Sequence, residues 1–259
     1  MFKEIFLFEL KYRFRRPATY AYFGILFLFL LLVTIYGNGP ASEKTNVNSP
    51  FAIANFLSVI TIFGTLIASA IMGVPVFRDI EHGTKDYFFS YPITEKGYLL
   101  GRYLGSFITL LFVMLGACLG IAVGSALGPL LGLSDNPERF GPFVLWHYLQ
   151  PMLVVVLPTM FFVGSIFFGL VALTRKVFVT YVGSIVLFIG YLVASALMQD
   201  IEQRDLASIL DPFANRTIGD MTRYWTPPEQ NTLTVPFTGN LLWNRLLWGG
   251  IGLLVLVYT

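Results

Sequence analysis

Long stretches without a charged side chain constrain the fold of this chain more than any other feature. Five such runs cover residues 18–36, 51–77, 103–134, 140–174 and 177–199. A helix rises about 1.5 Å per residue, so about 20 apolar residues cross the hydrocarbon core of a bilayer. Each of the five runs therefore predicts a membrane-spanning helix. A sixth run begins after Arg245, and the end of the chain at Thr259 makes it shorter than a full span.

Composition agrees with lipid as the solvent. Hydrophobic residues make up 56% of the 259 positions and charged residues 12%, which leaves too little polar surface to cover one water-soluble core. The apolar character is continuous and does not alternate as it does in the strands of an outer-membrane barrel. We expect an all-α integral membrane protein of six transmembrane helices, with residues 1–259 as a single membrane domain.

Basic residues predict the orientation of the chain. Lys3, Lys11, Arg13, Arg15 and Arg16 precede the first run. Four more lie between the second and third runs and two between the fourth and fifth, whereas the alternate connections carry fewer over longer segments. Cytosolic loops are enriched in Lys and Arg, so the N-terminus is predicted to be cytosolic. The first run is longer than the apolar region of about 7–15 residues in a secretory signal, so we expect it to be retained.

The sequence lacks the residues that several classes of protein need for their function. The net charge is only +2, which argues against a nucleic-acid partner. Cys118 is the sole cysteine and the two histidines, His82 and His147, are far apart in the sequence, so we expect neither a disulfide nor a metal centre. No GxxxxGK[ST] phosphate loop and no HExxH or GxSxG motif occurs, which predicts a chain without its own ATP site or catalytic centre. The five runs contain no Asp, Glu, Lys or Arg, which disfavours a proton-coupled carrier.

Glycines recur every fourth residue in the third run. These are Gly116, Gly120, Gly124 and Gly128. Residues at this spacing share roughly one helix face, and a face without side chains lets another helix approach closely. This face is expected to pack against a helix of the same subunit, to form a dimer contact with a second subunit, or to line a substrate pathway.

Prolines and one glycine predict helix breaks within two of the runs. Gly73 with Pro75 lies near the end of the second run, and Pro151 and Pro158 lie within the fourth. Each is expected to kink or end a helix.

The connection at 78–98 combines mixed charge with clustered aromatics. It contains Tyr87, Phe88, Phe89 and Tyr91, side chains that seldom face water as a group. The residues alone leave two interpretations open. A short helix could place the aromatics in the membrane interface, or the segment could dock into a partner protein.

The stretch EHGTKDYFFSYPITEKGYLLGRYLGS resembles the loop after the second span of type-2 ABC transporter permeases. The residues that carry the resemblance are Glu81, Gly83, Thr84, Phe88, Phe89, Pro92, Glu95, Lys96, Gly101 and Arg102. The resemblance implies that this loop contains a cytosolic coupling helix between spans two and three that seats in a separate ABC ATPase subunit, where ATP and Mg²⁺ are bound. The coupling residues it implies are Asp79, Glu81, Gly83, Thr84, Lys85, Phe88, Phe89 and Pro92.

Residues 1–17 give conflicting signals. Apolar and charged residues alternate between Phe6 and Arg15, a strand pattern. The basic segment FELKYRFRRPATY is similar to the juxtamembrane segment of the same permeases, which implies an interfacial helix. We expect the helix, because a lone strand at a membrane surface leaves its backbone unpaired.

The segment 199–244 is expected outside the cytoplasm, with short re-entrant or surface helices. Asp211-Pro212 and Thr226-Pro227 are helix-start signals. Trp243 and Trp248 suit the outer interface, where Arg245 is expected to extend its head to water. The stretch GNLLWNRLLW is similar to long bacterial permeases that continue into a second membrane half and a zinc aminopeptidase domain, which implies a fragment of a longer polypeptide.

The resemblance favours one function among three. The first is the permease of an ABC exporter in the bacterial inner membrane, working with an ATPase subunit and a second permease half in a homodimer, heterodimer or fused chain. A membrane anchor or scaffold for a fused or bound enzyme is the second, and an ion-coupled carrier is the third. Substrate-binding residues do not follow from the sequence.

Overall fold

The structure is a computed structural model that describes residues 2–37, 44–83, 94–134, 136–198 and 204–259. All regular elements in these ranges are helical. Two helices precede the first break in the description: α1 (Phe2–Phe14) and α2 (Pro17–Tyr36). They are followed by α3 (Pro50–Met72), α4 (Val74–Glu81), α6 (Glu95–Leu130), the 3₁₀ turn η1 (Pro137–Arg139), α7 (Leu145–Pro151), the π-helical turn η2 (Met152–Val156), α8 (Leu157–Thr174), α9 (Phe178–Leu197), α10 (Arg204–Leu210), α11 (Asn215–Met221), α12 (Pro227–Thr232) and α13 (Gly239–Tyr258).

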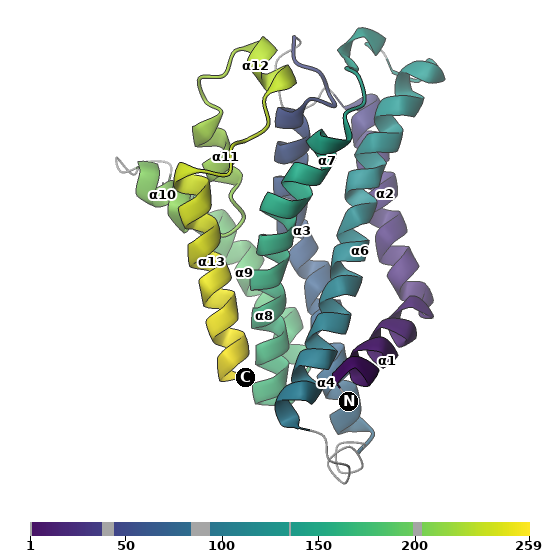
Figure 1. Cartoon of the computed structure of the whole chain (residues 1–259), viewed down its shortest axis with the longest axis vertical. Helices are drawn as coiled ribbons and strands as arrows, with labels where there is room; N and C mark the ends of the chain where they lie inside the picture. Colours follow the sequence, from purple (N-terminus) through teal and green to yellow (C-terminus); the bar gives the residue numbers. More distant parts are fainter. Residues whose placement is uncertain (1, 38–43, 84–93, 135, 199–203) are drawn as a thin grey trace.

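Within the described residues, six helical stretches are long and apolar enough to cross a bilayer, which confirms the predicted fold class. They run nearly side by side, with α3, α6 and α8 in the middle and α2, α9 and α13 around them (Figure 1). Helix α1 lies across one end of the bundle (Figure 1). The two chain ends lie at that same end, and α12 lies at the opposite one (Figure 1).

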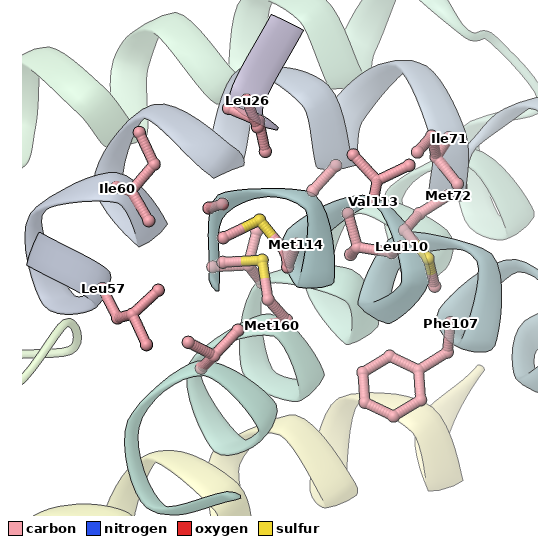
Figure 2. Packing of buried hydrophobic residues seen from close by; sticks show 14 of the residues in the cluster. Leu26, Leu57, Ile60, Ile71, Met72, Phe107, Leu110, Val113, Met114 and Met160 are labelled. Atoms are coloured by element: carbon pink, nitrogen blue, oxygen red, sulfur yellow. The ribbon is translucent and has the colours of Figure 1, made fainter. Parts of the chain in front are cut away.

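The core forms where α3, α6 and α8 meet. Met114 of α6 and Met160 of α8 extend toward α3, where Leu57 and Ile60 lie (Figure 2). A Cβ at Gly64 of α3 would stand 3.1 Å from the sulfur of Met114 and 3.5 Å from the Met160 methyl, so this glycine makes room for both. Flexible methionine side chains suit such an irregular space.

The predicted helix breaks lie where the sequence placed them. Helix α3 ends at Met72, Gly73 follows it, and Pro75 lies in the first turn of α4. Pro151 ends α7 and Pro158 lies in the first turn of α8, with η2 between the two helices. Proline supplies no backbone N–H, so the hydrogen-bond pattern changes at each site.

Two helix boundaries correct the sequence analysis. Helix α6 begins at Glu95, where the Thr94 hydroxyl accepts a hydrogen bond from Gly97 N, and it therefore includes Arg102. Helix α13 begins at Gly239, so the last helix is long enough to span and Arg245 lies inside it. Arg245 does not extend to water as expected: it is buried and donates to the Thr159 hydroxyl of α8 at 2.7 Å.

The chain between α10 and α11 re-enters the bundle. The Asn244 side-chain amide, in the second turn of α13, donates to the carbonyls of Ser208, Ile209 and Asp211. One turn deeper, Trp248 Nε1 donates to Ile209 O, and Ser58 within α3 donates to Phe213 O. Backbone polar groups at membrane depth need partners inside the protein, and these side chains supply them.

The other helix-start signals of this segment give one confirmation and one correction. Thr226 and Glu229 form a capping box that starts α12 at Pro227. Asp211-Pro212 does not start a helix at Pro212. Instead Asp211 accepts from Phe213 N and Arg216 N, and so holds the turn that precedes α11.

Candidate functional site

A buried carboxylate holds three helices together at the end of the bundle that carries α1. Glu9 of α1 is fully buried and its Oε1 accepts from Arg13 Nε at 2.8 Å. Its Oε2 accepts from Arg78 Nη2 of α4 at 2.9 Å and from Arg102 Nη1 of α6 at 2.5 Å. Hydrogen bonds between ionised groups are shorter and roughly twice as strong as those between neutral groups.

A second carboxylate extends the same network. Oδ2 of Asp79, in α4, lies 2.6 Å from Arg102 Nη2 and accepts a hydrogen bond from the Tyr98 hydroxyl at 2.5 Å. The guanidinium of Arg102 thus bridges Glu9 and Asp79, a geometry that a lysine could not reproduce. We call this group the N-terminal ion cluster; its members are Glu9, Arg13, Arg78, Asp79, Tyr98 and Arg102.

Arg13 replaces a backbone hydrogen bond that is missing at the junction of α3 and α4. In a continuous helix the Ile71 carbonyl would accept from the N–H of residue 75, but that residue is Pro75. Arg13 Nη2 donates to Ile71 O at 2.6 Å and takes this place. The cluster therefore fixes the end of α3 as well as α1, α4 and α6.

Together, the neighbouring positive charges lower the pKa of Glu9 by more than burial raises it. Burial alone would raise the pKa of the Glu9 carboxyl, but the guanidinium groups of Arg13, Arg78 and Arg102 lower it below the ordinary value of 4.5. Arg78 also lies 4.0 Å above the centre of the Tyr12 ring, a cation–π contact. Three arginines against two carboxylates leave one formal positive charge.

The cluster brackets residues 81–92, the part of the coupling loop that is expected to dock. Arg78 and Asp79 lie before these residues in α4, and Tyr98 and Arg102 lie after them in α6. Of the expected coupling residues, Asp79 is in the cluster, and Glu81 and Gly83 are exposed at and after the end of α4, with Gly83 at φ +63°. The other five, Thr84, Lys85, Phe88, Phe89 and Pro92, lie outside the described residues.

The sequence analysis assigned no role to Glu9, Arg13, Arg78 or Tyr98 in this site. It uses Arg13, Arg78 and Arg102 as orientation signals, and Arg102 also as part of the family pattern. One signal was available: Glu9 stands among basic residues, and Arg102 lies next to a long apolar run where an unpaired charge is costly. An acid and a base in such places are expected to form an ion pair.

The glycine face of α6 lies against α2 of the same chain. A Cβ at Gly116 would meet Phe23, one at Gly120 would meet the Phe27 carbonyl and Leu31 N, and one at Gly124 would stand 3.0 Å from the Leu31 carbonyl. Gly128, at the end of the row, lies near Phe140 and Ile35. Three of the four glycines, Gly116, Gly120 and Gly124, face backbone atoms of α2, so the two helices approach closely in this region.

Metal ligands do not gather in the part of the chain that the structure describes, where no three His, Cys, Asp or Glu side chains come together. The arrangement is instead a set of buried ion pairs that joins helices. No protein-family model, curated protein or solved structure matches this chain.

Proposed function

We propose that this chain is the membrane-spanning permease of an ABC exporter in a bacterial inner membrane, driven by a separate ATPase subunit. In this proposal the α1 end of the bundle faces the cytosol. Residues 81–92 dock onto the ATPase, with Phe88 and Phe89 as anchors and Glu81 and Lys85 at the edges.

The observation that supports this proposal most is the N-terminal ion cluster. A docking segment passes on movement only if both of its ends are tied firmly to the spans. Arg78 and Asp79 tie the preceding end, and Tyr98 and Arg102 tie the following end, through Glu9 and through each other. A push on the segment would therefore move α4, α6 and α1 as one unit, and α2 with them through the glycine face.

The energy source in this proposal is a partner, because the sequence has no phosphate loop. The partner ATPase supplies ATP-Mg binding and hydrolysis. A second permease half is the other expected partner, and the exposed apolar faces of α2, α9 and α13 offer it a surface within the membrane.

Loss of the aromatic anchors tests the proposal. Burying an aromatic side chain in a partner's groove is worth about 2 kcal/mol, so Phe88→Ala or Phe89→Ala is expected to weaken ATPase association roughly thirtyfold. The chain is purified from its native membrane, and the bound ATPase, identified by a phosphate-loop motif and by ATP hydrolysis, is quantified for each variant.

Tyr224→Ala is the matched control, since Tyr224 is an exposed aromatic that follows α11 and lies away from the α1 end. It should leave ATPase binding unchanged. Full ATPase binding and full substrate-stimulated hydrolysis in the Phe88→Ala/Phe89→Ala double variant would contradict the proposal.

A further inference from the structure

A cavity of about 600 Å³ lies between α9, α13 and the re-entrant chain at α10 and α11. Its volume falls within the range of about 300–1,000 Å³ that is typical of small-molecule sites. One face of α9 forms a wall with Leu187, Gly190, Tyr191 and Ala194, spaced three and four residues apart. This cavity is far from the N-terminal ion cluster in the chain and shares no residue with it.

The cavity reaches membrane depth. Phe213 and Trp248 line it, and Ser58 of α3 and Ile209 of the re-entrant chain hydrogen-bond to them inside the bundle. The neighbouring residues of α9 that face away, such as Ile189 and Val193, are exposed apolar side chains. An apolar molecule dissolved in the bilayer could therefore approach along α9.

Charged side chains line another part of the same cavity. They are Arg204, Asp211, Arg216 and Asp220. Among the described lining residues, two cations and two anions sum to no formal charge. Ionisable groups at or near membrane depth are costly and mark functional sites more often than structural ones.

Two of these side chains form a loose ion pair in the cavity wall. Arg216 Nε and Asp220 Oδ2 lie 3.8 Å apart, too far for a hydrogen bond, and the two side chains are 23% and 31% exposed. A hydroxyl in the cavity could accept from the Arg216 guanidinium and donate to the Asp220 carboxylate. Burial also raises the pKa of the Asp220 carboxyl despite the nearby Arg216, as expected of an under-solvated acid.

We propose that this cavity binds a single-chain amphipath whose head group carries no net charge and bears a hydroxyl. The acyl chain lies along α9 against Tyr191, Phe213 and Trp248. The hydroxyl of the head bridges the Arg216 guanidinium and the Asp220 carboxylate. The inference does not depend on the exporter proposal, because binding is a property of this chain alone.

Two glycines allow the cavity to be filled without disturbing the fold. Gly190 of α9 and Gly219 of α11 both line it, and a Cβ at either would meet no atom within 4 Å. Gly190→Leu and Gly219→Leu therefore place a side chain in open space. Gly24→Leu in α2 is the matched control, because Gly24 is also a helical glycine with open space but does not line the cavity.

The test is photolabelling of the full chain in nanodiscs of diacyl phosphatidylcholine. The probe is lysophosphatidylcholine with a diazirine in its acyl chain, and labelled peptides are quantified against probe concentration. We expect saturable labelling of α9 and of residues 210–220, and a loss of at least tenfold in apparent affinity in Gly190→Leu and Gly219→Leu. Gly24→Leu should label as the unmodified chain does.

Competition defines the head group. Unlabelled monoacylglycerol, which is neutral and bears hydroxyls, should displace the probe, whereas anionic lysophosphatidylglycerol should displace it at least tenfold less well. Arg216→Gln/Asp220→Asn should remove this preference. Labelling that does not saturate, or that both cavity-filling variants leave unchanged, would overturn the site, and equal displacement by the anionic lipid would overturn the head-group assignment.

Discussion

At the scale of single residues, Glu9 is the group on which most others depend. Its two oxygens accept from Arg13, Arg78 and Arg102, which come from three different helices. Removing one partner of a buried ion pair costs more than the pair contributes, because the remaining charges stay buried without compensation. Loss of the Glu9 charge would leave Asp79 as the one carboxylate of the cluster, against three guanidinium groups.

Glu9→Gln is therefore expected to destabilise the protein by about 3 kcal/mol. The measurement is thermal unfolding in detergent, followed by circular dichroism or by intrinsic fluorescence. Glu138→Gln is the control, since Glu138 is an exposed acid in η1 and the substitution is the same. Equal melting temperatures for the two variants would show that the cluster does not hold the helices together.

The effect of Glu9→Gln also has a defined pH dependence. The folded-state pKa of Glu9 lies below the ordinary 4.5, so its ionised form stabilises the fold above that pH, and the contribution disappears as pH falls through the folded-state pKa. The difference in melting temperature between Glu9→Gln and the unmodified protein should be full at pH 6 and should shrink below pH 4.5. A constant difference across this range would assign the loss to packing instead of charge.

At the scale of elements, two contacts explain how helices lie against each other. The first is the approach of α2 to α6 along the glycine row. The sequence predicted the row and its small-residue face but left the partner open, since periodicity describes one helix and carries no information about its neighbour. Only the folded chain shows Phe23, Phe27 and Leu31 of α2 on the other side.

Gly120→Leu is expected to push α2 away from α6, because a Cβ there would collide with the Phe27 carbonyl and stand 3.1 Å from Leu31 N. Backbone atoms cannot move aside as a flexible side chain can. We expect a loss of about 2 kcal/mol or more, measured by thermal unfolding in detergent. Gly24→Leu should melt as the unmodified protein does, and a Gly120→Leu variant of equal stability would contradict the close approach.

The second contact is between α13 and the re-entrant chain. Sequence analysis anticipated short helices in 199–244, but it missed the role of Asn244 because a single asparagine near the start of an apolar run gives no pattern. Asn244→Leu would leave the carbonyls of Ser208, Ile209 and Asp211 without this donor at membrane depth. At about 1–3 kcal/mol for an unsatisfied buried group, the expected loss is about 3 kcal/mol.

Limited proteolysis measures where that loss occurs. Asn244→Leu should become sensitive to cleavage between α10 and α11, because the chain there is held in place by the Asn244 side chain. Asn240→Leu is the control: its side chain donates to Asp205 at the surface, and it should resist cleavage like the unmodified protein. A resistant Asn244→Leu variant would mean that Ser58 and Trp248 hold the segment without it.

At the scale of the whole molecule, the six-helix plan could be predicted because span length and continuous apolar character act over 20 or more residues. The predicted helix boundaries are wrong at two charged residues. The apolar runs of the sequence stop at Arg102 and Arg245, yet both residues lie within membrane-spanning helices. Each is tolerated there by partners distant in the sequence, Glu9 and Asp79 for Arg102 and Thr159 for Arg245.

Orientation is the property of the whole molecule that follows from the distribution of charge. An even number of spans places the two chain ends on one side, and they lie at one end of the bundle (Figure 1). Basic residues near that end predict that it faces the cytosol. One qualification comes from Arg13, Arg78 and Arg102, which are occupied in buried ion pairs, although Lys3, Lys11, Arg15 and Arg16 remain exposed as flanking charge.

Cysteine labelling in intact cells measures this orientation directly. Glu95→Cys at the start of α6 should be shielded from a membrane-impermeant thiol reagent, and Tyr224→Cys near the opposite end should react. Both positions are exposed, and the native Cys118 is buried, so the background is low. Permeabilising the membrane should make Glu95→Cys react as well, which shows that the side chain itself is accessible. Labelling of Glu95→Cys but not Tyr224→Cys in intact cells would place the α1 end outside, where no ATPase could reach residues 81–92.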